Sequence, residues 1–299
     1  MADFLSMEHG MMAEGATFAR FGPDIPASPV ILSVCHAGRA YPEGLAANLR
    51  VPVSTLARLE DRHADALIAP LVDAGASAIV AQVPRALIDL NRDERDIDPR
   101  MVEGLPRHHS LIESAKQRGG LGLFPRSLPG CGDLWATRIS FAEARRRIEQ
   151  MHRHYHNGLA EMIDAAVRAH GCALLLDIHS MPPLKPGRMG EAVPEMVVGD
   201  RFGQSASAQL SATAQAVLGG RGYAVSLNHP YPGSHLLERH GNPARRRHAL
   251  QIEISRALYL DGRQDKPVPA IRDVQDSLIA LVQALIEDVT NDRWLDAAE

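Results

Sequence analysis

Ala173-Leu174-Leu175-Leu176-Asp177-Ile178-His179-Ser180 is the stretch of sequence that decides the fold. Its apolar start indicates a buried strand, because strands covered on both faces read as short continuous apolar runs. The run ends in polar residues, among them His179 and Ser180. Since α/β enzymes bind their ligands beyond the carboxyl ends of strands, we expect these side chains to face a cleft.

Further apolar runs lie on both sides of this stretch, and segments with helical spacing separate them. The predicted strands are 30–34, 77–83, 172–177, 195–198, 223–227 and 249–254, and the predicted helices are 53–74, 140–168, 205–218 and 274–289. A capping box, Ser140 with Glu143, begins the second helix, and Gly171 ends it. This alternation predicts an α/β fold with a central, mixed and mostly parallel sheet between helices.

The chain is expected to form one domain. Residues 1–28 have mixed composition and end in a Gly-Pro-rich segment, so we assign them to an N-terminal arm and residues 29–299 to the domain. Residues 93–131 are rich in charge, glycine and proline and have weak periodicity, which indicates a long irregular excursion. Long loops of this kind in a compact domain are often functional.

The composition excludes several classes of protein. With 299 residues, of which 45% are hydrophobic, the chain can bury a sizeable core. A net charge of −4 and an aromatic content of 4% give no basic surface and few stacking platforms for nucleic acid. Cys35, Cys131 and Cys172 lack C-x-x-C spacing, which argues against a disulfide framework and a thiolate zinc site. Neither a leader nor a sufficiently long apolar window is present, so we expect a cytoplasmic protein that binds no membrane, of undetermined oligomeric state.

Two histidines occupy equivalent positions, each just past an apolar strand. They are His36 and His179. Hydrolytic zinc sites commonly combine two histidines with one carboxylate and keep one position open. We take Asp61 as the carboxylate, with Glu60 and Asp65 as alternatives in the same segment. The competing interpretation is that all three acids are solvated charges on a helix.

Three further charged residues lie at or near predicted strands: two arginines after one strand and a glutamate within another. Arg85 and Arg92 stand after the strand at 77–83, and arginine forks bind carboxylates in a bidentate manner. Arginine is common in this chain, so both could equally be surface residues. Glu253 lies in the otherwise apolar strand 249–254, where an unpaired charge is expensive. This position makes Glu253 a candidate general base.

Five ordered blocks of sequence, spread over about residues 30–260, resemble the bacterial N-formylglutamate amidohydrolases. The blocks are Ser33–Gly38 with Tyr41-Pro42, Val83–Arg85 with Asp89–Arg92, Asp177–Pro182, Gly199–Gly203, and His248–Ile254 with Tyr259. That family belongs to a wider group of zinc hydrolases with the carboxypeptidase A and aspartoacylase type of fold. The resemblance therefore implies a central mixed sheet between helices and one Zn²⁺ per chain.

The resemblance also implies which residues form the metal site. His36 and His179 fall on the two zinc histidines, and Glu253 falls on the carboxylate that activates water. The wider group uses a His-x-x-Glu ligand pair that this chain lacks. The formylglutamate enzymes carry an Asp-x-His-x-Asp segment where residues 61–65 stand here. The carboxylate ligand is thus taken as Asp61, with the alternatives above left open.

The remaining candidates are assigned to the substrate. Arg85 matches the arginine that polarises the scissile carbonyl, and Asn91 with Arg92 match the pair that holds the substrate carboxylate. Ser180 and Tyr231 are further candidates for substrate binding. The implied reaction is hydrolysis of N-formyl-L-glutamate to formate and L-glutamate, in histidine degradation or a related turnover of N-acyl amino acids.

One loop departs from the family pattern. Family members usually have Pro-Tyr-x-Gly-Gly followed by Tyr or Phe, Ile and Thr, whereas residues 231–237 read Tyr-Pro-Gly-Ser-His-Leu-Leu. Two alternatives therefore stay open. The protein could be a zinc carboxypeptidase or a deacylase of another N-acyl amino acid, or it could be a metal-free binding protein on the same fold.

Overall fold

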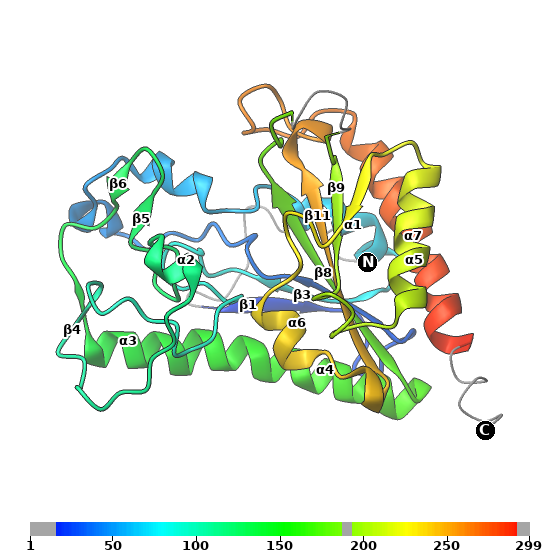
Figure 1. The fold of residues 1–299 in the computed structure, drawn as a ribbon, viewed down its shortest axis with the longest axis horizontal. Helices are drawn as coiled ribbons and strands as arrows, with labels where there is room; N and C mark the ends of the chain where they lie inside the picture. Colours follow the sequence, from blue (N-terminus) through cyan, green and yellow to red (C-terminus); the bar gives the residue numbers. More distant parts are fainter. Residues whose placement is uncertain (1–15, 187–192, 292–299) are drawn as a thin grey trace.

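The computed structural model describes residues 16–186 and 193–291, so residues 1–15 of the predicted arm and the end of the predicted domain lie outside the described residues. A seven-stranded sheet with the order β1-β3-β2-β8-β11-β9-β10 forms its centre (Figure 1). The strands are β1 (Phe18–Phe21), β2 (Val30–Val34), β3 (Ser77–Ala81), β8 (Ala173–Met181), β9 (Met196–Gly199), β10 (Val225–Leu227) and β11 (Arg247–Ser255). In this described sheet β1–β3 and β11–β9 are antiparallel and the other four pairings are parallel, which confirms the predicted mixed sheet.

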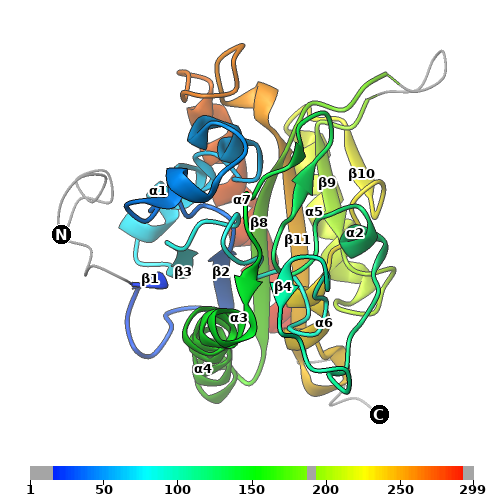
Figure 2. The same cartoon turned by 90° about the vertical axis from the view of Figure 1, so that its left-hand side faces the viewer.

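Helices cover both faces of the sheet (Figure 2). One layer contains α1 (Ala64–Asp73), α5 (Ala208–Gly220) and α7 (Ile271–Asn291), and the opposite layer contains α4 (His154–His170) and α6 (His235–His240). Side chains of β8 alternate between two apolar clusters, with Leu174 and Leu176 under the first layer and Leu175 under the second. Burial on both faces explains why this strand is apolar throughout.

The excursion forms a lobe beside one end of the sheet, to the left in Figure 1. The excursion contains β4 (Val102–Glu103), α2 (Ala115–Arg118) and β5 (Ser127–Leu128), and the residues that follow it add β6 (Gly132–Asp133) and β7 (Ile139–Ser140) to the lobe. Phe124 and Trp135 are buried in the same apolar cluster as Leu159 of α4. The lobe is therefore packed against the domain, although its sequence has little periodicity.

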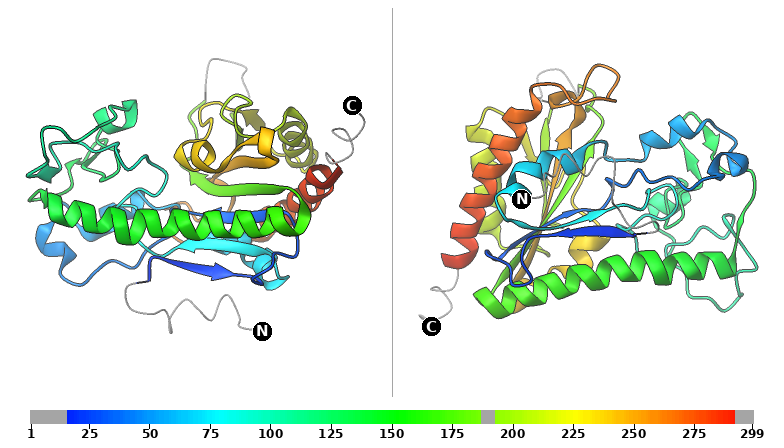
Figure 3. Two further views of the ribbon diagram at one scale, coloured as in Figure 1. Left: turned by 90° about the horizontal axis from the view of Figure 1, so that it is seen from below. Right: turned by 180° about the vertical axis from the view of Figure 1, so that it is seen from behind.

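The predicted helix over 140–168 is one continuous helical segment with an internal irregularity. α3 (Phe141–Arg147) leads into a π-helical segment, Ile148–Arg153, and then into α4. The whole helical segment runs beneath the lobe and the sheet (Figure 3). Ser140 Oγ accepts a hydrogen bond from the Glu143 backbone N–H at 3.1 Å, as the capping box predicts. Gly171 ends α4 with a φ of 74°, which glycine adopts at little cost.

The predicted helix over 53–74 is wrong in its middle. The chain forms a 3₁₀ segment, Val53–Arg58, and α1 begins only at Ala64. Between them the Asp61 backbone N–H donates to the His36 carbonyl at 3.0 Å, and the Glu60 carbonyl accepts from Arg256. Tertiary hydrogen bonds have replaced the helical ones, so Asp61 lies in a loop rather than on a helix face.

Two strand boundaries also differ from the prediction. β8 continues to Met181, so His179 lies within the strand; β11 runs beside it in parallel as far as Ser255 and supplies the hydrogen bonds. Residues 18–21 of the predicted arm form β1, which pairs with β3 at the edge of the sheet. No helix in residues 16–186 and 193–291 is long and apolar enough to cross a membrane.

Candidate active site

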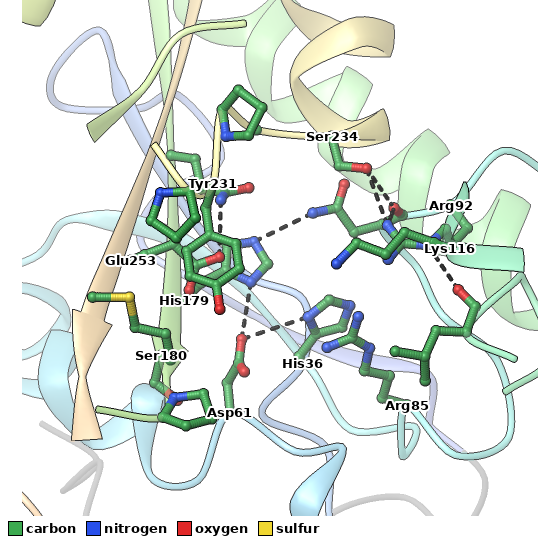
Figure 4. A pocket seen from close by; sticks show the side chains of 18 of the residues that line it. His36, Asp61, Arg85, Arg92, Lys116, His179, Ser180, Tyr231, Ser234 and Glu253 are labelled. Carbon is green, nitrogen blue, oxygen red and sulfur yellow. Dashed lines mark hydrogen bonds and ion pairs between the residues drawn. The ribbon is translucent and has the colours of Figure 1, made fainter. Parts of the chain in front are cut away.

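A cavity of about 390 Å³ opens at the carboxyl ends of β2, β8 and β11 (Figure 4). Apart from the alternative acids Glu60 and Asp65, the candidate side chains of the sequence all line it: His36, Asp61, Arg85, Asn91, Arg92, His179, Ser180, Tyr231 and Glu253. They come from segments more than 200 residues apart. The parallel strands bring these segments together because their carboxyl ends meet at one edge of the sheet.

Strand register places Glu253 beside the second histidine. β8 and β11 are parallel, and Glu253 pairs with His179 across them. Gln251, on the same face of β11, donates from Nε2 to Glu253 Oε1 at 3.0 Å. Burial, reinforced by Asp61, raises the pKa of Glu253 to about 7, although His179 acts in the opposite direction. A carboxyl group with a pKa near neutrality can both accept and release a proton at working pH.

One carboxylate oxygen lies between the two histidines. Asp61 Oδ2 is 2.9 Å from His179 Nδ1 and 3.5 Å from His36 Nδ1 (Figure 4). Although burial opposes it, the two histidines hold the pKa of Asp61 well below its usual range. Among the described residues, the buried His36 Nδ1 atom has no hydrogen-bond partner. Two imidazole nitrogens and a carboxylate oxygen therefore converge at this point.

Carboxylates hold the far side of each imidazole ring. His36 Nε2 is 2.8 Å from Asp89 Oδ1, and His179 Nε2 is 2.6 Å from Asp177 Oδ2. Asp177 in turn accepts a hydrogen bond from Ser33 Oγ at 2.7 Å. Outer carboxylates of this kind orient metal-ligating histidines and make them more basic. The converging Nδ1 atoms and Asp61 thus fit a divalent metal such as Zn²⁺, which binds two histidines and a carboxylate.

The other acids considered for the metal site are engaged elsewhere. Asp65 forms a bidentate ion pair with Arg39, at 2.7 and 3.0 Å. Glu60 accepts hydrogen bonds from Tyr41 and Arg62. Of the three acids, Asp61 is the one next to the histidines.

Cys35, which the sequence did not indicate as a metal ligand, lies near both histidines. Donor atoms of Cys35, His36 and His179 lie within 4.8 Å of one another. The Cys35 Sγ atom is 3.8 Å from His179 Nε2, the nitrogen that Asp177 already contacts. Cys35 therefore lies on the opposite side of the His179 ring from Asp61, and its side chain is packed in the apolar core.

Asp89 also orients the first arginine. Arg85 Nε and Nη2 both lie 2.9 Å from Asp89 Oδ2, which leaves Nη1 without a partner among the described residues. The loops that carry His36 and Arg85 approach closely at Gly38, where a Cβ atom would collide with the Val83 carbonyl. This contact requires glycine and brings Arg85 close to the histidines.

The Asn91–Arg92 pair is fixed by several hydrogen bonds. Asn91 Oδ1 accepts from the Leu236 backbone N–H at 2.8 Å, and its Nδ2 lies 3.4 Å from His179 Nε2. The buried Arg92 donates from Nη1 to Ser234 Oγ at 3.0 Å and from Nε to the Leu121 carbonyl at 3.1 Å. Its guanidinium is thus held in place at the cavity wall.

Residues 28–260 match the family described as N-formylglutamate amidohydrolase. The chain belongs to this family. It is 30% identical over 271 residues to the N-formylglutamate deformylase of Pseudomonas putida, covering 86% of this chain and 92% of that protein. The N-formylglutamate deformylase of Pseudomonas aeruginosa is 26% identical, over 87% of this chain and 92% of that protein.

A solved structure gives the same result for the fold. The crystal structure of N-formylglutamate amidohydrolase from Ralstonia eutropha JMP134 has a TM-score of 0.84 at 31% identity, over 93% of this chain and 99% of that chain. The family match and these relatives span the segments that build the cavity. The resemblance inferred from five sequence blocks is thereby confirmed at the level of the family.

Several side chains of this amidohydrolase-family cavity were missed by sequence reasoning. They are Arg58, Lys116, Ser234, Gln251 and Arg256. Arg256 follows Glu253 at the end of β11 and donates from Nε to Ser180 Oγ at 3.0 Å. Its place at a strand end was a usable signal. Lys116 comes from the irregular excursion, where no local pattern indicates that it faces the cavity.

A cluster of four histidines lies next to the Asn91–Arg92 segment, and two of them contact its backbone. His156 Nε2 lies 3.0 Å from the Leu90 carbonyl, and His152 Nε2 lies 2.8 Å from the Arg92 carbonyl. The other two members are His235 and His240 of α6. Burial, with a contribution from Arg239, lowers the pKa of all four, to about 4 for His235 and about 3 for His240.

Burial favours the neutral form of the four histidines in this cluster. Donor atoms of His152, His156 and His235 lie within 4.8 Å of one another, but the positive charge of Arg239 disfavours a divalent cation there. The four rings instead pack against one another, with centroids of His156 and His240 5.2 Å apart.

We expect acid to destabilise the fold through this cluster. Because the folded-state pKa values lie below the unfolded value of 6.5, the unfolded chain binds more protons as the pH falls from about 7 towards 4, and stability is lost over that range. Thermal unfolding of wild type and His240→Phe at pH 7.5 and 5.0 tests this. The variant should lose less melting temperature between the two pH values. An equal loss in both proteins would mean that His240 is not involved.

Proposed function

We propose that this protein is a cytoplasmic, metal-dependent amidohydrolase that cleaves N-formyl-L-glutamate to formate and L-glutamate, in histidine degradation or a related turnover. The observation that carries the proposal is the convergence of His36, Asp61 and His179 beside Glu253. Family membership and relatives named as N-formylglutamate deformylases support the substrate.

The side chains of the cavity have different roles in the proposed hydrolysis. A divalent metal held by His36, Asp61 and His179 would act as a Lewis acid and lower the pKa of water at the site. Glu253 takes the proton from the attacking water and delivers it to the leaving nitrogen as the C–N bond breaks. Arg85, oriented by Asp89, has Nη1 available for the oxygen that becomes negatively charged.

A turnover screen tests the proposed activity. Metal-loaded protein is incubated with matched N-formyl and N-acetyl derivatives of glutamate, aspartate, glutamine and alanine, and released amine is measured. N-formyl-L-glutamate should give the highest kcat/KM. Preference for N-acetyl substrates would favour a different deacylase, and absence of hydrolysis of every substrate would favour a binding protein on the same fold.

Arg92 is proposed to hold the α-carboxylate of the substrate together with Asn91. Since a hydrogen bond to a charged group contributes about 1.5 to 3 kcal/mol, Arg92→Lys should lower kcat/KM for N-formyl-L-glutamate about 10- to 100-fold. Metal content should not change. The α-amide of the substrate should be poor with wild type and lose little further in the variant. Equal rates of wild type on acid and amide would contradict this role.

A further inference from the structure

The substrate of the proposed reaction carries two negative charges. Both the α-carboxylate and the side-chain carboxylate of N-formyl-L-glutamate are ionised at neutral pH. Under the proposed function, Arg92 with Asn91 binds one of them. The second carboxylate also leaves water on binding, which is costly unless a charged or hydrogen-bonding partner replaces the solvent. The cavity should therefore contain a further cation.

Among the described residues, five with cationic side chains line the cavity, and protein groups bind four of these side chains. Arg58 donates to Cys131 Sγ and to the Pro129 carbonyl. The partners of Arg85, Arg92 and Arg256 are those described above. Arg85 and Arg256 also lie beside the acids Asp89 and Asp61. The hydrogen bonds restrict the orientation of the four guanidinium groups. The neighbouring acids neutralise part of the charge of Arg85 and Arg256.

Lys116 differs from the other four cations. Within residues 16–186 and 193–291, its ammonium group makes no hydrogen bond or ion pair. Its side chain lies beside Arg92 and extends towards the cavity, on the side away from Glu253 (Figure 4). The residue is exposed at the mouth of the cavity. Desolvation by the surrounding protein, with Arg92 and Arg85 nearby, lowers the pKa of Lys116. A carboxylate placed here would remove this electrostatic repulsion.

The backbone of Lys116 is held in a fixed relation to Arg92. The Lys116 carbonyl accepts from the Leu121 backbone N–H at 2.8 Å, and the Leu121 carbonyl accepts from Arg92 Nε at 3.1 Å. The neighbouring Gln117 is buried and donates from Nε2 to the Ile97 carbonyl at 3.2 Å. The excursion therefore presents Lys116 from an anchored turn and not from a free loop.

We propose that Lys116 binds the side-chain carboxylate of the substrate and so determines the preference for a dicarboxylic N-formyl amino acid. This assignment rests on the proposed function, which it refines. Lysine suits this part of the substrate because a compact ammonium group on a flexible stem can follow a carboxylate at the end of a mobile side chain. Arg92, held at several atoms, suits the α-carboxylate, whose position is fixed by the scissile bond.

The test compares N-formyl-L-glutamate with N-formyl-L-glutamine, which has the same length but no second charge. We compare wild type, Lys116→Met, Lys116→Arg and the control Arg118→Met, which removes an exposed cation from the same turn outside the cavity. Lys116→Met should lower kcat/KM for N-formyl-L-glutamate about 10- to 100-fold and leave N-formyl-L-glutamine within about twofold. Lys116→Arg should keep most of the activity, and Arg118→Met should match wild type.

The outcomes separate this assignment from the proposed function. If metal-loaded wild type hydrolyses N-formyl-L-glutamate but Lys116→Met loses the same factor on both substrates, or on neither, the assignment is wrong and the proposed function stands. If wild type hydrolyses neither substrate, the proposed function is wrong and the assignment falls with it.

Discussion

Glu253→Gln is expected to abolish nearly all turnover of N-formyl-L-glutamate while the protein keeps its fold and its metal. General acid–base catalysis contributes about 10² to 10⁴ in rate, so kcat should fall by that factor. Glutamine has nearly the same shape, and its carbonyl oxygen can still accept the hydrogen bond from Gln251 Nε2. What it cannot do is take a proton from water, which the carboxyl group, with its pKa of about 7, is able to do.

Steady-state kinetics, elemental analysis and thermal unfolding of the same preparations distinguish catalysis from structure. The control is Glu161→Gln, which makes the same chemical change at an exposed position on α4. The control should match wild type in all three measurements. A Glu253→Gln enzyme with near wild-type kcat would show that Glu253 is structural.

The second large effect is expected when a proposed metal ligand is removed. His179→Ala and His36→Ala should each lose bound metal and, with it, detectable hydrolysis. Each removes one of the two imidazole nitrogens that converge on Asp61 Oδ2. The loss should be severe because the remaining pair of ligands cannot complete a site that needs about three protein donors.

Metal content by elemental analysis, before and after dialysis against zinc, measures this effect. Asp65→Ala serves as the control, because Asp65 is paired with Arg39 and should not affect the metal. Asp61→Ala should behave like the histidine variants. Equal metal in wild type and both histidine variants would refute the site, whereas loss with Asp65→Ala but not Asp61→Ala would reassign the carboxylate.

Local sequence patterns were sufficient to select those candidate residues that lie at or near the end of a strand. His36 and Glu253 could be singled out because a polar residue just after or within an apolar run needs an explanation. Asp61, predicted as a metal ligand on a helix, lies beside the histidines but in a loop. The helical spacing of 53–74 gave no sign of the tertiary hydrogen bonds at Glu60 and Asp61.

The residues that sequence reasoning missed act through contacts made at long range. Asp89 orients both His36 and Arg85, but its neighbours in sequence give no indication that two other segments converge on it. Lys116 belongs to a stretch without periodicity, and only the packing of the lobe against the domain brings it to Arg92. The buried histidines next to Arg92 likewise come from two helical segments far apart in the chain, the one that contains α4 and α6.

The sequence by itself determined the α/β class, the apolar strands and the family, because burial imposes a pattern on each element and five motif blocks preserve their order. Only the tertiary structure decided which acid lies between the histidines, which arginine groups are already paired, and which cation of the cavity has no partner among the described residues. The physical reason is that these properties depend on distances between segments far apart in the chain. Hydrogen bonds form only at contact distance, and salt and water weaken charge interactions beyond about 10 Å.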